Sequence, residues 1–131
     1  MVMRISRVLL DRLIAEAVAA PDREICGLLL GNAEEILEAT PAANVSSNPH
    51  DSFEIDPQAL VDAHRAERQG GPCLIGYYHS HPTGLAQPSA TDRAQASGDG
   101  RIWAIIGGGD VTLWRDVGGG FEHLFYQVVA G

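Results

Sequence analysis

The sequence predicts a single α/β domain in which helices pack on a mainly mixed β-sheet. Its 131 residues fit one domain and can bury a sizeable core without disulfides or a structural metal. Hydrophobic residues make up 45% and charged residues 20%, which are values of globular chains. Short apolar runs typical of strands alternate with segments of helical periodicity, with no linker and no internal repeat. We therefore expect residues 1–131 to form one α+β unit.

The first helix is expected to follow Ser6, whose hydroxyl can cap its N-terminus. Pro21 ends this segment, because proline cannot continue a helix. Arg12 and Glu16 lie four residues apart and are expected to pair on the exposed face. The apolar residues of the inner face follow one another at helical spacing: Leu10, Leu13, Ile14 and Ala17.

Two strands joined by a tight turn are expected next. The continuous apolar run Ile25–Leu30 predicts a buried strand, and Gly31-Asn32 ends it with turn residues. Glu34–Thr40 predicts the returning strand. The stretch Pro41–Asp51 is rich in proline, asparagine and serine and therefore predicts a loop.

A second helix is expected to begin at Pro57, where the missing N–H does no harm, with Asp56 as its cap. A brief strand at Phe53–Ile55 precedes it, and Gly70-Gly71 ends it. Its inner stripe is expected to contain Leu60, Val61 and His64.

The second half of the chain is expected to supply mostly strands. Glycine-rich segments separate them, and Gly107–Asp110 predicts a hairpin turn rather than a phosphate loop, because no Lys-Ser/Thr pair follows it. The expected elements are a strand at Cys73–Tyr78, a loop at Pro82–Pro88, a helix at Ala90–Ser97, a hairpin of Ile102–Ile106 and Val111–Trp114, and a last strand at Phe121–Val129.

Charge and composition exclude several classes of partner. The 17 acidic residues outnumber the nine basic ones and give a net charge of -8, which disfavours nucleic acid and anionic membranes. No apolar run reaches the ~18 residues that span a bilayer, and no secretory segment follows Met1–Ser6, so a cytoplasmic location is expected. Cys26 and Cys73 are too few for a disulfide framework; two buried reduced thiols are the favoured interpretation, and a single disulfide stays open.

The segment Gly76–Pro82 carries two histidines at alternate positions. Side chains alternate along an extended chain, so His79 and His81 are expected to face the same side. Asp92 falls in the first turn of the following helix, and the loop between them is long enough to fold it back over the histidines. Two imidazoles and one carboxylate suit Zn²⁺ and leave a fourth position for water, as in catalytic zinc sites.

Two further residues complete this candidate site. Ser89 and Asp92 have the spacing of a capping box, which is compatible with a metal-binding role because a helix start holds Asp92 in a fixed place. A zinc hydrolase also needs a base, and the pattern His-Glu-x-x-His is absent. Glu24, at the mouth of an apolar strand, is the best candidate for that base, although a lone glutamate there would ordinarily be an exposed charge.

Together these residues resemble the JAMM (MPN-plus) metalloprotease motif, in which a distant glutamate is followed by His-x-His-Pro and then by Ser-x-x-Asp. The residues in those places are Glu24, His79, His81, Ser89 and Asp92. The flanking segments are also similar to small prokaryotic members of the family, and the resemblance covers about residues 5–128: Glu24–Gly31, Phe53–Pro57 and Gly76–Pro82.

The resemblance implies an MPN/JAB fold of the cytidine-deaminase-like type and a zinc-dependent peptidase. His79, His81 and Asp92 would bind one Zn²⁺ per chain, Glu24 would be the general acid/base, and Ser89 would position the water or steady the oxyanion. Family members hydrolyse a peptide or isopeptide bond after the C-terminal tail of a ubiquitin-like or sulfur-carrier protein.

Such a tail is expected to add as an extended strand beside the sheet. The Pro41–Asp51 loop, with Asn44 and Asn48, would form a wall of its groove.

Other functions fit the sequence less well. A non-catalytic MPN-type scaffold for protein interactions usually lacks the ligand residues that this chain retains. A zinc deaminase would need a Cys-x-x-Cys pair and a His-x-Glu, which are absent. DNA-linked relatives of the family exist, but the acidic charge argues against that role.

Overall fold

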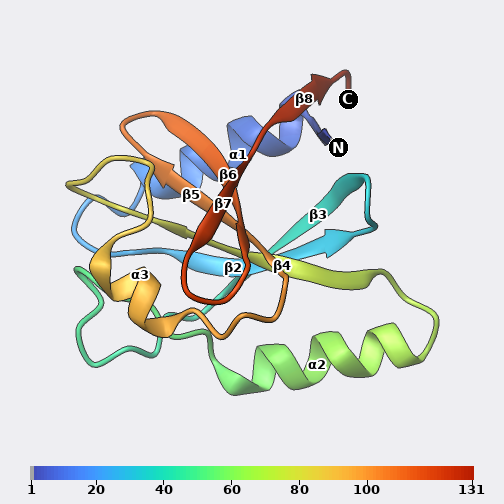
Figure 1. The fold of residues 1–131 in the computed structure, drawn as a ribbon, viewed down its shortest axis with the longest axis horizontal. Helices are drawn as coiled ribbons and strands as arrows, with labels where there is room; N and C mark the ends of the chain where they lie inside the picture. The colour runs from blue at the N-terminus through green and yellow to red at the C-terminus, as the bar shows by residue number, and fades with distance from the viewer. Residues whose placement is uncertain (1) are drawn as a thin grey trace.

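In the computed structural model, which describes residues 2–131, eight strands form one mixed sheet with helices on its faces (Figure 1). This is the predicted fold class. The strands are β1 (Met3–Ser6), β2 (Cys26–Gly31), β3 (Glu35–Ala42), β4 (Cys73–Ser80), β5 (Ile102–Gly107), β6 (Asp110–Asp116), β7 (Phe121–Leu124) and β8 (Tyr126–Val129). The helices are α1 (Arg7–Val18), α2 (Pro57–Arg68) and α3 (Ala90–Gln95).

The strands lie in the order β7-β6-β5-β4-β2-β3-β1-β8. The pairs β4–β5, β1–β3 and β1–β8 are parallel, and the other neighbours are antiparallel. The strands β2 and β4 therefore occupy the interior of the sheet, and each has a paired neighbour on both sides.

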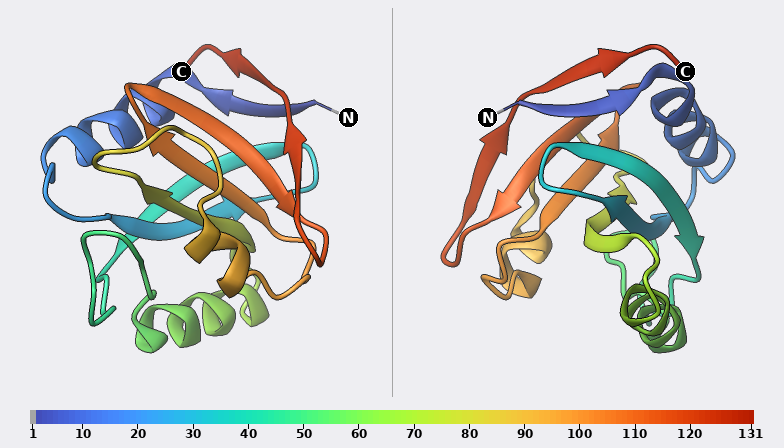
Figure 2. Two further views of the ribbon diagram at one scale, coloured as in Figure 1. Left: turned by 60° about the vertical axis from the view of Figure 1, so that its left-hand side comes forward. Right: turned by 90° about the vertical axis from the view of Figure 1, so that its right-hand side faces the viewer.

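The two margins of the sheet come from one short segment. The strands β7 and β8 are consecutive along the chain and are separated by Phe125 alone, so the predicted single strand Phe121–Val129 is in fact two strands. Figure 2 shows this C-terminal segment running from one margin of the curved sheet to the other. The strand β1 was not predicted, because four residues are too few to show a periodicity. In the structure its Met3 and Ile5 side chains are buried.

Local capping chemistry starts two of the helices as predicted. The Ser6 hydroxyl accepts the Leu9 N–H at 3.1 Å, and the Asp56 carboxylate accepts the Gln58 N–H at 3.1 Å. The inner stripe of α2 was predicted wrongly at Val61, which is 46% exposed. Val61 follows Leu60 by one residue and therefore points about 100° away around the helix. The side chains of α2 that pack on the sheet are Ala59, Leu60 and Ala63.

Two apolar clusters cover the two faces of the sheet. One contains Leu29 and Tyr78 and packs under α1, and the other contains Leu28 and Trp103 and packs under α2. Neighbouring residues along a strand point to opposite faces, which explains this division. Figure 1 shows α1 and α2 on opposite sides of the sheet.

The two cysteines are free thiols at opposite ends of the β2–β4 pair. Cys26 pairs with His79 and is buried, whereas Cys73 pairs with Gly31 and is exposed. This separation leaves no disulfide between them, since a disulfide requires Cα atoms within about 7 Å. Within residues 2–131, no helix is both long enough and apolar enough to span a membrane.

Candidate metal centre

The structure brings both histidines to the end of β4, facing the same side. His79 is fully buried within β4, and His81 follows immediately after it. Their Nε2 atoms lie 3.1 Å apart. Backbone contacts hold this segment in place: the His81 N–H donates to the Ile106 carbonyl at 2.8 Å, and the Ser80 hydroxyl accepts the Ile25 N–H at 2.9 Å.

Asp92 reaches the histidines from the first turn of α3 and is 2% exposed. Its Oδ1 atom lies 3.0 Å from Nε2 of His79, and its Oδ2 atom lies 3.0 Å from Nε2 of His81. The predicted capping box is also present. The Ser89 hydroxyl accepts the Asp92 N–H at 3.1 Å, and the Ser89 N–H donates to Asp92 Oδ2 at 2.9 Å. The cap therefore aims the carboxylate at the two imidazoles.

The spacing of these atoms fits a zinc ion. With Zn²⁺–N bonds of about 2.0–2.1 Å, neighbouring ligand atoms of a tetrahedron lie about 3.3 Å apart. The Nε2–Nε2 and Nε2–carboxylate distances are 3.0–3.1 Å. Two imidazoles and a carboxylate are also a donor set that zinc prefers.

The electrostatics favour the ligand forms of Asp92 and His79. Burial alone would raise the pKa of Asp92, but hydrogen bonds to His79 and His81 outweigh it and hold that pKa well below its usual value. Burial lowers the pKa of His79, which keeps this imidazole neutral. For His81, burial acts in the same direction, but hydrogen bonds to Asp92 and to the Leu85 carbonyl raise its pKa.

The Leu85 carbonyl is a partner of His81 that sequence patterns do not reveal. It accepts a hydrogen bond from Nδ1 of His81 at 2.8 Å, which leaves Nε2 as the ligand atom. The next residue is held as well, because the Thr112 hydroxyl donates to the Ala86 carbonyl at 2.6 Å. The loop also packs closely on Gly107, where a Cβ atom would lie 2.9 Å from the Ala86 nitrogen.

Glu24, the predicted base, lies just before β2 and is 3% exposed. One carboxylate oxygen of Glu24 and one ring nitrogen from each of His79 and His81 all lie within 4.8 Å of one another. Its Oε1 atom is buried and has no hydrogen-bond partner among residues 2–131. Burial raises the pKa of Glu24 from 4.5 to about 7, which is the range that suits a general base near neutral pH.

The loop after β3 holds the Glu24 backbone. The Glu24 N–H donates to the Pro49 carbonyl at 2.7 Å, and the Asn44 side-chain amide donates to the Glu24 carbonyl at 2.9 Å. The Asn44 Oδ1 atom accepts the backbone N–H groups of Ser46 and Glu54. Asn44 therefore organises this loop and positions Glu24.

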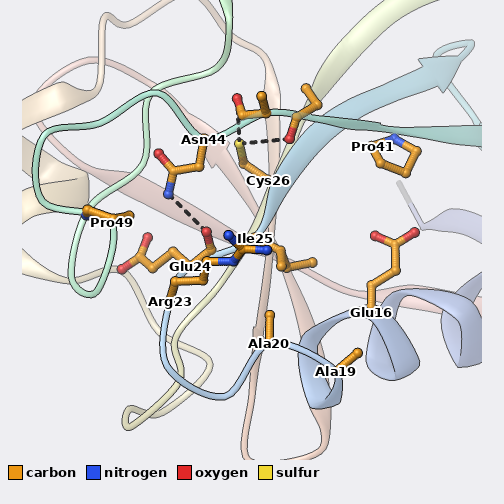
Figure 3. A pocket seen from close by; sticks show the side chains of 12 residues that line it. Glu16, Ala19, Ala20, Arg23, Glu24, Ile25, Cys26, Pro41, Asn44 and Pro49 are labelled. Carbon is orange, nitrogen blue, oxygen red and sulfur yellow. Dashed lines mark hydrogen bonds between the residues drawn. The ribbon is translucent and has the colours of Figure 1, made fainter.

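Two hollows meet at Glu24. A groove of about 470 Å³ is lined by Glu24, His81 and Ser89. A second hollow of about 590 Å³ extends from Glu16 on α1 to Asn44 and Pro49 in the loop after β3 (Figure 3). The base, one metal-site histidine and the capping serine thus share one open groove. Since β2 and β4 have paired neighbours on both sides, neither of them offers a free edge to an added strand.

A known protein family matches most of the chain. The family model of prokaryotic homologues of the JAB domain matches residues 6–117. A solved JAB1/MPN domain protein from Archaeoglobus fulgidus superposes with a TM-score of 0.67 at 24% identity, covering 97% of this chain and 99% of that one. The two proteins share the fold.

Two curated relatives carry functional names. The chain is 38% identical over 91 residues to a desampylase from Haloferax volcanii, covering 68% of this chain and 66% of the relative. It is 34% identical over 96 residues to a probable TtuB-protein conjugate cleaving protease from Thermus thermophilus, covering 73% of this chain and 64% of the relative. The chain therefore spans slightly less than two thirds of each relative.

Proposed function

This chain belongs to the family of prokaryotic JAB-domain homologues, and we propose that it is a zinc-dependent metallopeptidase of the JAMM type. The proposed reaction is hydrolysis of a peptide or isopeptide bond after the C-terminal tail of a ubiquitin-like or sulfur-carrier protein. The catalytic unit is one domain formed by residues 1–131. Its two free thiols fit the reducing conditions of the cytoplasm, the location that we propose.

One observation carries the proposal. Two imidazole nitrogens and both oxygens of Asp92 converge at 3.0–3.1 Å, and beside them stands Glu24, whose buried Oε1 atom has no hydrogen-bond partner within residues 2–131. A cluster that served only stability would satisfy each buried polar atom. A buried glutamate left without a partner next to a zinc-type donor set is instead typical of a catalytic site.

The proposed roles follow from the positions of the side chains. When bound, Zn²⁺ lowers the pKa of a water ligand to about 7 and polarises the scissile carbonyl. His79, His81 and Asp92 would hold the ion. Glu24 would accept the proton of the attacking water and return it to the leaving amine, as its raised pKa allows.

Ser89 has a second task in this proposal. Its oxygen accepts the Asp92 N–H, so its O–H proton stays free to donate toward the groove. A hydroxyl aimed at developing negative charge lowers a barrier by on the order of 2–4 kcal/mol.

The substrate class rests on the curated relatives. One is named a desampylase and the other a probable protease that cleaves TtuB-protein conjugates. We extend this class to the present chain: a small protein modifier whose C-terminal tail lies along the groove. A narrow passage at the metal, once a tail occupies the groove, would favour glycine next to the cleaved bond.

The proposal is tested by metal analysis combined with a cleavage assay. Purified protein is expected to contain one zinc per chain by plasma mass spectrometry, and His81→Ala is expected to lose it. The assay uses a sulfur-carrier protein that ends in Gly-Gly followed by extra residues, with product masses as the readout. Wild-type protein is expected to cut after Gly-Gly.

The outcomes separate an enzyme from a scaffold. Zinc binding without cleavage of fused or conjugated carrier proteins would favour the non-catalytic scaffold. Absence of zinc in the wild-type protein, even after incubation with the metal, would overturn the metal site itself.

A further inference from the structure

The two histidines of the metal centre are held in different ways. His81 donates from Nδ1 to the Leu85 carbonyl, the kind of polar partner that metal-binding histidines usually have. Nδ1 of His79 is buried and has no hydrogen-bond partner among residues 2–131. Hydrogen bonding of His79 is therefore confined to Nε2, and other contacts must hold the Nδ1 side of the ring.

Aromatic side chains surround that ring. Phe53 stacks on His79 with ring centroids 4.3 Å apart and an angle of 18° between the planes. Trp103 meets His79 edge-on, at 5.6 Å and 89°. Phe53 and Trp103 also contact each other at 5.5 Å, so the three rings form one packed unit.

This arrangement restricts rotation of the imidazole. The parallel Phe53 ring and the perpendicular Trp103 ring together fix the plane of the His79 imidazole. In that orientation Nε2 lies 3.0 Å from Asp92 and 3.1 Å from Nε2 of His81. Phe53 is 6% exposed and Trp103 is 5% exposed, so both rings are themselves held by the core.

We propose that Phe53, backed by Trp103, is the positioning residue that orients His79 for zinc in place of a polar partner. The inference rests on the proposed function, because it assigns Phe53 a role toward the metal of that site. Phe53 belongs to the segment between β3 and α2, so the conformation of this segment is coupled to the geometry of one metal ligand.

The decisive variant is Phe53→Leu, which keeps an apolar side chain and removes the flat ring. It is expected to weaken zinc binding about tenfold, as loss of an outer partner of a metal ligand does. Phe53→Tyr keeps the ring and should retain wild-type affinity, because Phe53 borders an open hollow of about 440 Å³ that can accept the hydroxyl. Zinc dissociation constants are measured by competition with a chromophoric chelator.

Ile55→Val is the matched control. Ile55 lies in the same segment and the same apolar cluster as Phe53 and is 8% exposed. It should leave zinc affinity unchanged. The visible absorption of the Co²⁺-substituted protein is a second readout, since its bands report ligand geometry. The Co²⁺ spectrum should change in Phe53→Leu and should match the wild-type spectrum in Phe53→Tyr and Ile55→Val.

Wild-type zinc binding together with unchanged affinity and spectrum in Phe53→Leu would overturn the inference and leave the proposed function intact. An equal loss in Ile55→Val would also overturn it, because the effect would then be general loosening of the cluster. Failure of the wild-type protein to bind zinc would instead defeat the proposed function.

Nuclear magnetic resonance of the zinc-loaded wild-type protein tests the inference without any variant. The Nδ1 proton of His81 should resonate downfield and exchange slowly because it is hydrogen-bonded to Leu85. The ring protons of His79 should shift upfield beneath the Phe53 ring. A downfield, hydrogen-bonded Nδ1 proton on His79 would contradict the inference.

Discussion

Glu24 is a buried carboxyl group whose position weakens the fold while it serves the chemistry. Its Oε1 atom is buried without a partner among residues 2–131, and burial raises its pKa from 4.5 to about 7. Because the folded-state pKa lies above the unfolded one, folding favours the protonated form. The stability of the metal-free protein should therefore fall as the pH rises from about 4.5 to about 7.

We predict that Glu24→Gln keeps zinc, abolishes turnover and makes the metal-free protein more stable above neutral pH. The gain should be on the order of 1–3 kcal/mol at pH 8 and should vanish near pH 4, because each unit of pKa shift corresponds to about 1.4 kcal/mol. Urea unfolding of chelator-treated protein at both pH values measures it. Glu54→Gln, at an exposed glutamate, is the control.

Surviving turnover in Glu24→Gln would show that another group is the base. An identical pH dependence of stability in wild type and variant would show that ionisation of Glu24 does not weaken the fold.

The residues of the site differ in how well the sequence reveals them. His79, His81, Asp92 and Glu24 could be named because the chemistry depends on their side-chain type, and the structure brings them together. The Leu85 carbonyl could not, since every residue has a carbonyl and only the fold decides which one meets His81.

The stacking of Phe53 on His79 was equally hidden. It joins residues that are far apart in the sequence, through shape rather than through a local pattern.

At the scale of elements, the N-terminal cap of α3 positions a residue of the metal centre. The Ser89 hydroxyl caps the helix, and Asp92, three residues later, faces both histidines. Loss of the cap should therefore affect both stability and metal binding.

We predict that Ser89→Ala lowers the free energy of unfolding by about 1 kcal/mol and weakens zinc binding, whereas Ser89→Thr retains the cap and most of the affinity. Thermal unfolding and chelator competition measure the two effects. Ser6→Ala removes the corresponding cap of α1 and serves as the control, with a similar loss of stability and no change in zinc affinity. Equal zinc affinity in Ser89→Ala and wild type would contradict the coupling.

Element prediction succeeded where the signal is local. The caps Ser6, Asp56 and Ser89 and the continuous apolar strands were expected from nearby residues alone. The strand β1 and the break at Phe125 were missed, because the β1–β8 pairing joins Met3 with Tyr126. A partner so distant in sequence leaves no trace in a short window.

At the scale of the whole molecule, residues 121–129 supply both margins of the sheet, as β7 and β8. The β8 strand covers β1, and the Tyr126 hydroxyl donates to the Val111 carbonyl at 2.7 Å. The two margins of the sheet are therefore linked by residues 121–129.

We predict that deletion of residues 126–131 leaves the protein largely unfolded at 37 °C, because β1 loses its neighbour. Tyr126→Phe keeps β8 and loses one hydrogen bond, which should cost about 1–2 kcal/mol and leave zinc content unchanged. Circular dichroism melting and metal analysis measure both variants. A deletion variant as stable as Tyr126→Phe would show that β8 contributes little.

The pairing of Met3 with Tyr126 also affects when the sheet can form during protein synthesis. Of the eight strands, the ribosome produces β1 first and β8 last, so this side of β1 stays unpaired until β8 has left the exit tunnel. A nascent chain stalled before Tyr126 would therefore leave the β8-pairing edge of β1 open to chaperones, although Met3 and Ile5 are buried in the folded protein.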